Sequence, residues 1–451
     1  MKTQVVLLAA GQGTRMRSRL PKLLHPLAGQ PMILHSLSAL SKLSDALPIL
    51  VVGHESDKVR EVVGEQAQFV EQAEQLGTGH ALLQTKAGLA GKADLVLVSN
   101  ADLPLLTAET IEQLLKSQKE SDTAFTMLTV DSPQPRGFGR ILRGKAGEVL
   151  AIVEEAEATA EQRNITELNV GVYCFRADWL WPALEKIKPS SAKGEYYLTD
   201  LVEIAVKDEG RVNALKLDNP SEAIGINTRV HLAQAEQKLR ERINHHWMLA
   251  GVTIVDPNTT YIDVSVSIGQ DSTIWPNTTL QGYSKIGENC SLGPNTVVRN
   301  SQIQNDCKVE ASYVEHAIIE NHVDIGPFAH MRKGAHLSEG VHIGNYGEVK
   351  NSQLGPGVKM GHFSYIGDAI IGANSNIGAG TITANYDGEG KHQTEIGKNV
   401  FIGSDTMLVA PLKIGAGART GAGAVVTKDV AANTIVVGIP ARAIRKVEKK
   451  D

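Results

Sequence analysis

The sequence predicts two folds in one chain: an α/β domain of the Rossmann-like type, followed by a left-handed parallel β-helix built from six-residue repeats. Three observations support this prediction. The 451 residues exceed the size at which one hydrophobic core usually stops growing. Short apolar runs alternate with helical patterns up to about residue 225. Beyond residue 250, aliphatic residues recur every six positions over much of the chain.

The α/β domain is expected over residues 1–228. Its strands are predicted at 5–10, 49–52, 95–98 and 124–130, where short apolar runs occur, and its helices at 31–43, 78–89 and 107–116, where apolar residues follow helical spacing. Such alternation favours a largely parallel sheet, which binds ligands at the carboxyl ends of its strands. Residues 229–250, charged and free of turn formers, are predicted to form a linker helix.

The β-helix is expected over residues 251–451. A period of six does not fit an α-helix, whose faces recur every 3.6 residues, but it suits a triangular coil in which each hexad points one aliphatic residue inward. The glycines that follow many of these aliphatic residues are expected to turn the corners. The interruption at 385–394 is expected to be a polar loop that leaves the coil, and such insertions often build a binding face.

Composition excludes several classes of function. A net charge of −5, with acidic and basic residues mixed along the chain, provides no basic surface for nucleic acid or a membrane. No apolar run approaches the roughly twenty residues of a membrane span. The cysteines Cys174, Cys290 and Cys307 are too scattered for a disulfide framework or a zinc site. We therefore expect a cytoplasmic protein whose partners are small molecules.

A glycine-rich segment follows the first predicted strand. In residues 8–22, Gly11 and Gly13 let backbone N–H groups approach a phosphate closely, while Arg15 and Lys22 supply positive charge. The segment lacks the Gly-Lys-Ser/Thr of a Walker A loop and the third glycine of the dinucleotide fingerprint. A Gly-x-Gly after a strand is also common as an ordinary tight turn, but the two basic residues favour a phosphate cradle.

Asp102 follows the predicted strand 95–98 and so lies at the carboxyl edge of the sheet. It is either a solvated turn former or, opposite a phosphate cradle, a ligand of Mg²⁺, which prefers one or two carboxylates plus substrate phosphates. Nucleotidyl transfer needs little covalent help, because a sugar-phosphate oxygen is already anionic. Alignment with the α-phosphate and neutralisation of charge can supply the catalysis.

His362 is the candidate base of the repeat region. Tyr365 follows it closely, and Arg332 and Lys350 lie one to two coils away by the six-residue count. A lone histidine is often only structural, and a repeat solenoid can be a spacer. With two cations nearby, however, a sugar phosphate could be clamped while His362 takes a proton from an attacking sugar amine.

Two motifs of the N-terminal region, Leu8-Ala-Ala-Gly-x-Gly-Thr-Arg-Met with Pro21-Lys22 and Gln75-Leu-Gly-Thr-Gly-His80, resemble the bacterial bifunctional N-acetylglucosamine-1-phosphate uridyltransferase and glucosamine-1-phosphate acetyltransferase family. The resemblance covers essentially the whole chain. It implies a homotrimer in which acetyl-CoA acetylates glucosamine 1-phosphate. The product then reacts with UTP to give pyrophosphate and UDP-N-acetylglucosamine, a precursor of peptidoglycan and lipopolysaccharide.

The resemblance also implies the residues of the uridylyltransferase site. Mg²⁺ would bind Asp102 and Asn227, and the nucleotide and sugar would be held by Leu8, Ala9, Ala10, Gly11, Arg15, Lys22, Gln72, Gly77, Thr78, Gly139, Glu154 and Asn169. The family often has Tyr-Gly-Asp where this chain has Asn100-Ala101-Asp102, so we expect a different pocket wall there. Ala9-Ala10 departs from the Ala-Gly-Gly of adenylyl- and mannosyl-type pyrophosphorylases, which favours uridine.

In the acetyltransferase site, the resemblance gives His362 the role of proton acceptor. Glucosamine 1-phosphate would contact Arg332, Lys350, Tyr365 and Asn376, and acetyl-CoA would contact Ala379, Asn385, Tyr386, Ser404 and Ala422 between subunits. The closing Gly438-Ile-Pro-Ala-Arg442 is more similar to other hexapeptide acyltransferases, and Arg442 is expected to contact CoA phosphate.

Two alternative functions remain open at this point. The chain could be a monofunctional sugar-1-phosphate nucleotidyltransferase with a regulatory or oligomerising solenoid, but such a solenoid has no use for His362 beside two cations. It could also be an assembly scaffold, which would leave the phosphate cradle and Asp102 without a role.

Overall fold

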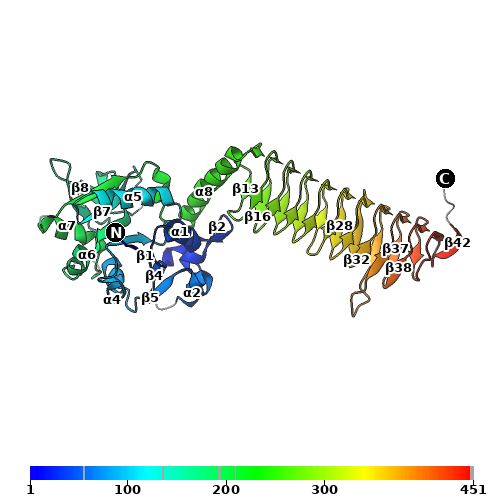
Figure 1. Cartoon of the computed structure of the whole chain (residues 1–451), viewed down its shortest axis with the longest axis horizontal. Helices are drawn as coiled ribbons and strands as arrows, with labels where there is room; N and C mark the ends of the chain where they lie inside the picture. The colour runs from blue at the N-terminus through cyan, green and yellow to red at the C-terminus, as the bar shows by residue number, and fades with distance from the viewer. Residues whose placement is uncertain (54–55, 135–136, 191–193, 209, 447–451) are drawn as a thin grey trace. The chain divides into compact units, whose positions relative to one another are not determined.

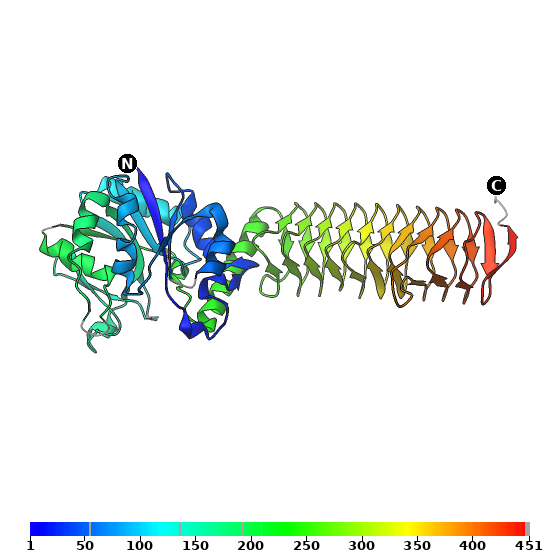
Figure 2. The ribbon, with the colours of Figure 1, turned by 90° about the horizontal axis from the view of Figure 1, so that it is seen from below.

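The computed structural model describes residues 1–53, 56–134, 137–190, 194–208 and 210–446. The chain divides into two compact units, Met1–Leu239 and Arg240–Asp451, and the division falls within helix α8 (Arg229–Leu249). Figures 1 and 2 show the α/β unit in blue to green and the repeat unit in green to red. Within these described ranges, no helix combines the length and apolarity needed to cross a bilayer.

The α/β unit is built on a sheet with strand order β11-β7-β10-β6-β1-β4-β5. Strand β10 is antiparallel to both of its neighbours, and the other pairs are parallel. The sheet is therefore largely parallel, as predicted, with a hairpin of β8 and β9 beside β10. The strands are β1 (Thr3–Ala9), β4 (Ile49–Val52), β5 (Gln68–Glu71), β6 (Leu95–Asn100), β7 (Phe125–Asp131), β8 (Arg140–Arg143), β9 (Val149–Val153), β10 (Glu167–Arg176) and β11 (Val212–Lys216).

The helices of this unit pack apolar faces against the sheet around buried residues such as Val6, Val98 and Phe125. They are α1 (Met32–Ser41), α2 (Asp57–Val63), α3 (Thr78–Leu83), α4 (Lys86–Leu89), α5 (Ala108–Glu120), α6 (Ala177–Leu184) and α7 (Leu201–Lys207). The single helix predicted over 78–89 is wrong, because the structure has two. The backbone N–H and the hydroxyl of Thr85 both donate to the carbonyl of Leu82, which ends α3 one turn early.

The repeat unit consists of three parallel sheets, and each sheet takes every third strand of the coil. Sheet 1 runs from β12 (Thr253–Ile254) to β41 (Thr434–Val437), with the antiparallel β42 (Arg442–Lys446) at its end. Sheet 2 runs from β13 (Tyr261–Ile262) to β40 (Val425–Val426), and sheet 3 from β14 (Ser267–Ile268) to β38 (Leu412–Ile414). This triangular coil confirms the predicted hexapeptide β-helix.

The strand register explains the period of the sequence. In sheet 1, Ile325 pairs with Ile343 and Ile343 with Met360, steps of 18 and 17 residues, and all three side chains are fully buried. Each coil therefore uses about three hexads. In sheet 3, Ala369 pairs with Thr394, a step of 25 residues, because the segment between β34 (Ile382–Ala384) and β35 (Thr394–Ile396) leaves the coil as the predicted loop.

The expectation that the glycines following the periodic aliphatic residues turn the corners is mostly wrong. Of the glycines that follow the aliphatic residues, only Gly293 and Gly326 have a positive φ. Most of the others lie where a Cβ would collide with the neighbouring coil: at Gly378 it would come within 2.6 Å of the Ile402 carbonyl oxygen, whereas at Gly367 it would meet the Tyr365 ring of the same strand. The other left-handed positions of the repeat unit are taken by Asn and Asp residues, by others such as Phe328 at φ 62°, and by glycines outside this set, such as Gly334 and Gly357. Glycine is needed here for close stacking of coils.

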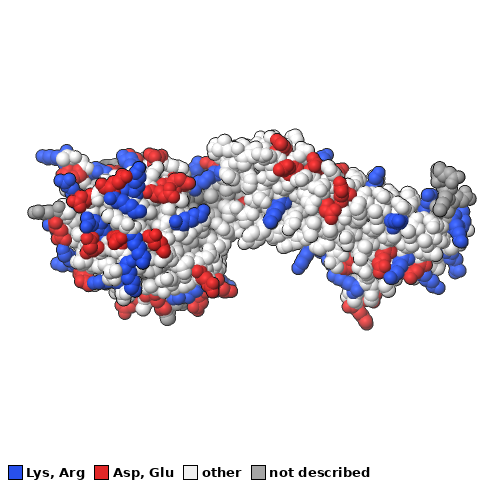
Figure 3. Space-filling view, in the orientation of Figure 1, with Lys and Arg blue, Asp and Glu red and all other residues white. Residues whose placement is uncertain are grey.

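Charged side chains are dispersed over the α/β unit. On the face visible in Figure 3, acidic and basic groups alternate over this unit without forming a single-sign patch. This distribution agrees with the small net charge of −5. It is the surface expected of a protein that binds small anions in pockets rather than along an extended basic surface.

Candidate active sites

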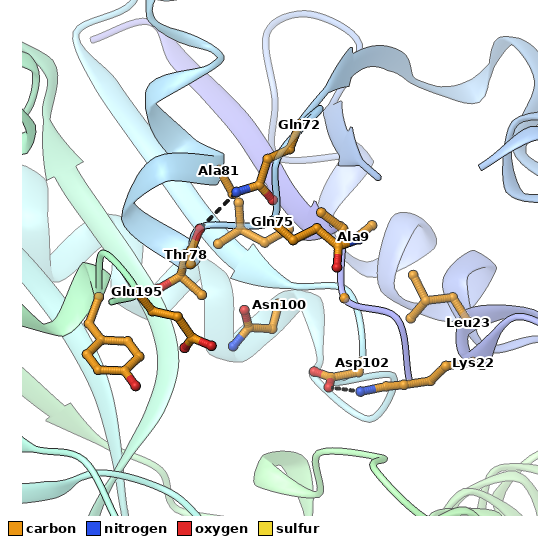
Figure 4. A pocket seen from close by; sticks show the side chains of 15 residues that line it. Ala9, Lys22, Leu23, Gln72, Gln75, Thr78, Ala81, Asn100, Asp102 and Glu195 are labelled. Atoms are coloured by element: carbon orange, nitrogen blue, oxygen red, sulfur yellow. Dashed lines mark hydrogen bonds and ion pairs between the residues drawn. The ribbon is translucent and has the colours of Figure 1, made fainter. Parts of the chain in front are cut away.

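The α/β unit has a cavity of about 310 Å³ at the carboxyl ends of β1 and β6 (Figure 4). It is lined by predicted residues from four segments that are distant in sequence. These are Leu8, Ala9, Ala10, Gly11, Lys22, Gln72, Gly77, Thr78, Asn100 and Asp102. The cavity thus lies at the carboxyl edge of the sheet, where parallel topology favours ligand binding.

Four polar side chains meet beside this cavity, and two of them, Lys22 and Asp102, line it. The Lys22 Nζ lies 2.5 Å from Asp102 Oδ2 and 3.0 Å from Asn227 Oδ1, and an Arg15 N–H donates to the same Asn227 oxygen over 2.9 Å. Asp102 and Asn227 therefore present oxygens to one common cation position. Such a donor pair fits Mg²⁺, which takes its remaining ligands from water and phosphate. Among the described residues, no group of three or more His, Cys, Asp or Glu forms a candidate metal site.

The residues predicted to contact the sugar lie outside the cavity lining but close to one another. The Asn169 N–H donates to the Gly139 carbonyl over 2.9 Å, and a Cβ at Gly139 would lie 3.8 Å from the Glu154 carboxyl carbon. The side chain of Asn169 is bonded over 2.7 Å to the hydroxyl of Tyr173. Burial raises the pKa of Tyr173, which keeps this phenol neutral.

Ala101 and Asn100 occupy different positions despite being adjacent. Ala101 is buried and does not line the cavity, and its carbonyl accepts a hydrogen bond from Ser36. Asn100 lines the cavity, and a Cβ at Gly171 would come within 2.6 Å of its Nδ2. The glycine at position 171 therefore gives the Asn100 side chain its room.

Sequence reasoning missed five lining residues: Leu23, Gln75, Ala81, Glu195 and Tyr197. The last two belong to a segment that bonds back to the loop before α3, since Tyr196 N–H donates to the Leu76 carbonyl and Gly79 N–H to the Tyr196 carbonyl, both over 2.8 Å. The only local signal was a Tyr-Tyr pair in a chain with 4% aromatic residues. Spacing alone does not show that this segment reaches the cavity.

In the repeat unit, three predicted sugar-phosphate residues lie in or directly after strands of sheet 2, on neighbouring coils. The Arg332 N–H donates to the Val349 carbonyl over 2.8 Å, so Arg332 stands one coil from Lys350. Lys350 in β28 (Gly347–Lys350) is in turn paired with Gly367 of β31 (Ser364–Gly367), which also carries Tyr365. The Arg332 guanidinium is paired with Glu348 over 2.7 Å.

His362 and three predicted acetyl-CoA residues lie along one corner, between sheets 1 and 2. In sheet 1, successive register partners are Lys359, Asn376, Phe401 and Arg419. Three residues beyond each partner, on consecutive coils, stand His362, Ala379, Ser404 and Ala422. Backbone bonds continue along this corner, from Asp405 N–H to the Ala379 carbonyl and from Gly423 N–H to the Ser404 carbonyl. The His362 side chain is exposed.

The loop at the opposite corner of sheet 2 carries the other predicted residues. Asn385 donates to Asp368, and Tyr386, 61% exposed, forms an antiparallel bridge with Lys391. The neighbouring Lys350 ammonium lowers the pKa of Lys391. The loop therefore places a second ammonium group, that of Lys391, near Lys350 at the edge of sheet 2.

Two predicted residues lie on sheet 1 rather than sheet 2. Asn376 is in β33 (Asn376–Ile377), one strand from β30 (Lys359–Met360), which precedes His362. Arg442 is in β42 and exposed, and three strands separate it from β33. The structure therefore does not bring Arg442 beside His362 within one chain.

Comparison with known proteins agrees with this architecture. Residues 5–187 match the MobA-like NTP transferase domain, and residues 265–300 and 393–428 match the bacterial transferase hexapeptide family of six repeats. Fold and sites together define a nucleotidyltransferase joined to a hexapeptide-repeat transferase.

Over its whole length the chain is similar to bifunctional proteins. It is 45% identical to the bifunctional protein GlmU of Heliobacterium modesticaldum over 97% of this chain and 95% of that protein. Identity is 44% to the GlmU of Syntrophomonas wolfei, over 97% of each, and 43% to that of Streptococcus agalactiae serotype V, over 97% and 95%. The chain belongs to the GlmU family of bifunctional proteins. The predicted family, fold class and two-activity enzyme are thereby confirmed.

Proposed function

We propose that the α/β unit transfers a uridylyl group from UTP to N-acetylglucosamine 1-phosphate, and that the repeat unit first makes this acceptor by acetylating glucosamine 1-phosphate. The observation that carries the proposal is that each unit has its own cationic cluster beside a group suited to the chemistry. In the α/β unit, Arg15 and Lys22 adjoin Asp102. In the repeat unit, Lys350 and Tyr365 lie in sheet 2, next to the His362 corner, and Arg332 directly follows β25 (His330–Met331) of the same sheet.

In uridylyl transfer, an oxygen of the sugar 1-phosphate attacks the α-phosphorus of UTP, and pyrophosphate leaves. Backbone N–H groups at Gly11, with Lys22 and Arg15, hold the phosphates and offset their charge. Asp102 and Asn227 hold Mg²⁺, which when bound adds to this neutralisation. Glu154, Asn169 and the Gly139 carbonyl orient the sugar ring. The remaining residues that line the cavity hold the uridine.

In acetyl transfer, the amine of glucosamine 1-phosphate attacks the thioester carbonyl of acetyl-CoA. His362 takes the proton that the nitrogen loses as the amide forms, and the CoA thiolate leaves. Arg332 and Lys350 hold the sugar phosphate, with Tyr365 and Asn376 on the sugar. Beyond His362, the same corner carries the small side chains of Ala379, Ser404 and Ala422. This row of small side chains leaves room for an extended thioester chain. Asn385, Tyr386 and Arg442 complete the acetyl-CoA site.

The repeat unit also supports assembly. We assign it the interface of a homotrimer, with acetyl-CoA held between subunits. Such a site gives the exposed Arg442 a role, since Arg442 lies far along sheet 1 from the His362 of its own chain. The protein acts in the cytoplasm, where UTP and acetyl-CoA occur and where its three cysteines stay free.

Assays of both half-reactions on the purified chain test this proposal. We expect acetyl-CoA-dependent formation of N-acetylglucosamine 1-phosphate and UTP-dependent formation of UDP-N-acetylglucosamine. Uridylyl transfer without any acetyl transfer would instead support a nucleotidyltransferase whose solenoid only regulates or oligomerises.

A further inference from the structure

We propose that Arg140 is a positioning residue for the acceptor sugar of uridylyl transfer. It holds in place the two segments that carry Gly139 and Glu154, both expected to contact the sugar. The inference rests on the proposed uridylyl transfer and deepens it. Arg140 does not line the cavity, so it acts only through its neighbours.

Arg140 stands where the three segments expected to contact the sugar meet. It is the first residue of β8, and it pairs in register with Val153 of β9 and with Leu168 of β10. Each of these partners directly precedes an expected sugar contact, Glu154 after Val153 and Asn169 after Leu168. The third expected contact is the glycine directly before Arg140. A displacement of Arg140 therefore moves the three contacts relative to one another.

The side chain of Arg140 ties two of these segments together. Its Nη1 donates to the Phe138 carbonyl over 2.5 Å and to the carboxylate of Glu155. Phe138 directly precedes Gly139, and Glu155 directly follows Glu154. One guanidinium nitrogen thus fixes the backbone beside one sugar contact to the residue beside the other.

Packing around Gly139 transmits any movement of this segment. A Cβ at Gly139 would lie 2.6 Å from Ile152 Cγ2 and 3.4 Å from the Val153 carbonyl oxygen, so β8 begins in close contact with β9. The Gly139 carbonyl also accepts the N–H of Asn169 over 2.9 Å. A shift at Gly139 therefore cannot be absorbed locally and reaches both neighbouring strands.

Stability alone is a poor explanation for this arginine. Its side chain is 1% exposed, and its Nε has no partner among the residues that the structure describes. Burial removes the hydration of a charge, and apolar replacement of a buried ion pair often leaves stability unchanged or raises it. A buried guanidinium bonded to two segments instead fixes the geometry of the groups that those segments carry.

The test is Arg140→Met in the full-length chain, with the KM of each substrate of uridylyl transfer measured separately. We expect the KM for N-acetylglucosamine 1-phosphate to rise about tenfold or more, the effect of losing hydrogen bonds from a charged group. The KM for UTP and the rate of acetyl transfer should stay unchanged. A partly unfolded preparation lowers kcat but not KM, so this difference separates positioning from loss of folded protein.

Glu155→Ala provides a second variant that does not disturb the core, because the Glu155 side chain is 42% exposed. It should raise the same KM by a smaller factor, since the bond from Arg140 to the Phe138 carbonyl remains. In the double variant Arg140→Met/Glu155→Ala, the rise should be no larger than in Arg140→Met alone, because both changes remove the same contact.

Arg143→Met is the matched control. Arg143 lies at the other end of β8 and binds both carboxylate oxygens of Glu167 over 2.6 Å. It is thus a second arginine–glutamate pair on the same strand, but neither partner adjoins an expected sugar contact. The KM for N-acetylglucosamine 1-phosphate should be the same in this variant as in the wild type.

An unchanged KM for N-acetylglucosamine 1-phosphate in Arg140→Met and Glu155→Ala would overturn the role of Arg140. An equal rise in the KM for UTP, or in the control variant, would do so as well. Failure of the uridylyl proposal has a different signature: the wild-type chain would form no UDP-N-acetylglucosamine while still transferring acetyl groups.

In that case, calorimetric binding of UDP-N-acetylglucosamine and of UTP decides the role of Arg140. Positioning of the sugar requires that Arg140→Met weakens binding of the sugar nucleotide and leaves binding of UTP unchanged. Equal weakening of both, weakening of neither, or a wild-type chain that does not bind UDP-N-acetylglucosamine would overturn it.

Discussion

Single side chains in the α/β site share partners, so their roles are coupled. Lys22 contacts both Asp102 and Asn227, and Arg15 contacts Asn227 as well. Removal of one of these side chains therefore changes the electrostatic environment of the others. The sequence could identify all four, because they stand in or beside motifs. It could not identify Glu195 or Tyr197, which reach the cavity only through backbone bonds to a segment more than a hundred residues away.

Asp102→Ala should abolish formation of UDP-N-acetylglucosamine, with a loss of at least about 10² in kcat/KM, because phosphate charge is no longer offset by a held cation. Acetyl transfer by the same protein should be nearly intact, since its residues lie in the other unit. Both half-reactions should be measured on one preparation. Equal loss of both activities would argue against independent sites.

His362→Ala should reduce acetyl transfer by roughly 10² to 10⁴, the usual effect of a positioned proton acceptor, with little change in the affinity for glucosamine 1-phosphate. Uridylyl transfer should be unaffected. Steady-state kinetics together with a melting curve make the check. A folded, equally stable variant that acetylates at the wild-type rate would remove His362 from the mechanism.

Asp200 gives a pH-dependent prediction about stability. Burial, followed by the carboxylates of Glu203, Glu157 and Glu154, raises the pKa of Asp200 to about 6. The folded state therefore binds a proton more tightly than the unfolded state, and stability falls as the pH rises from the unfolded pKa toward 6. Asp200→Asn should raise the melting temperature at pH 8 and have little effect near pH 4. An equal shift at both pH values would contradict this account.

At the level of elements, sequence periodicity predicted most of the fold because both regular patterns are local. The four predicted strands of the α/β unit correspond to β1, β4, β6 and β7. The hexad period located the coils, and the polar segment located the loop. The predicted role of the glycines that follow the periodic aliphatic residues was wrong, because coils contact one another through residues about 17 positions apart in the sequence. A single sequence does not show which backbone atoms will stand opposite.

Two glycines on neighbouring coils, Gly344 and Gly361, test whether close stacking of the coils depends on glycine. Gly344→Ala should destabilise the repeat unit by about 1–3 kcal/mol, the usual cost of overpacking, because its Cβ would collide with the Gly361 carbonyl. In Gly361→Ala, the nearest atom to the new Cβ is 4.0 Å away, so this variant should melt close to the wild-type temperature. Equal melting temperatures for the two variants would show that coil stacking does not depend on glycine.

For the whole molecule, the predicted boundary at residue 228 can be compared with the division of the structure at Leu239. The first part of α8 belongs to the α/β unit, since Glu236 accepts a hydrogen bond from Ala28 N–H over 2.8 Å and Arg229 donates to the Met16 carbonyl. Helical pattern predicted α8 itself, but the point at which its contacts change depends on tertiary packing.

A fragment of residues 1–239 should therefore keep uridylyl transfer and be monomeric, because the repeat unit supplies the proposed trimer interface. A fragment of residues 1–228 should melt at a lower temperature, since it loses the contacts of Glu236 and Arg229. Light scattering and melting curves check both statements. A trimeric 1–239 fragment would place the interface in the α/β unit.

The central claim is that one chain carries two independent sites acting in sequence. A complementation assay tests it most directly: Asp102→Ala and His362→Ala proteins are supplied with glucosamine 1-phosphate, acetyl-CoA and UTP, separately and mixed. Each protein alone should form almost no UDP-N-acetylglucosamine, while the mixture should form it readily, because the acetylated intermediate made by one protein is used by the other. A mixture as inactive as its two components would contradict the account.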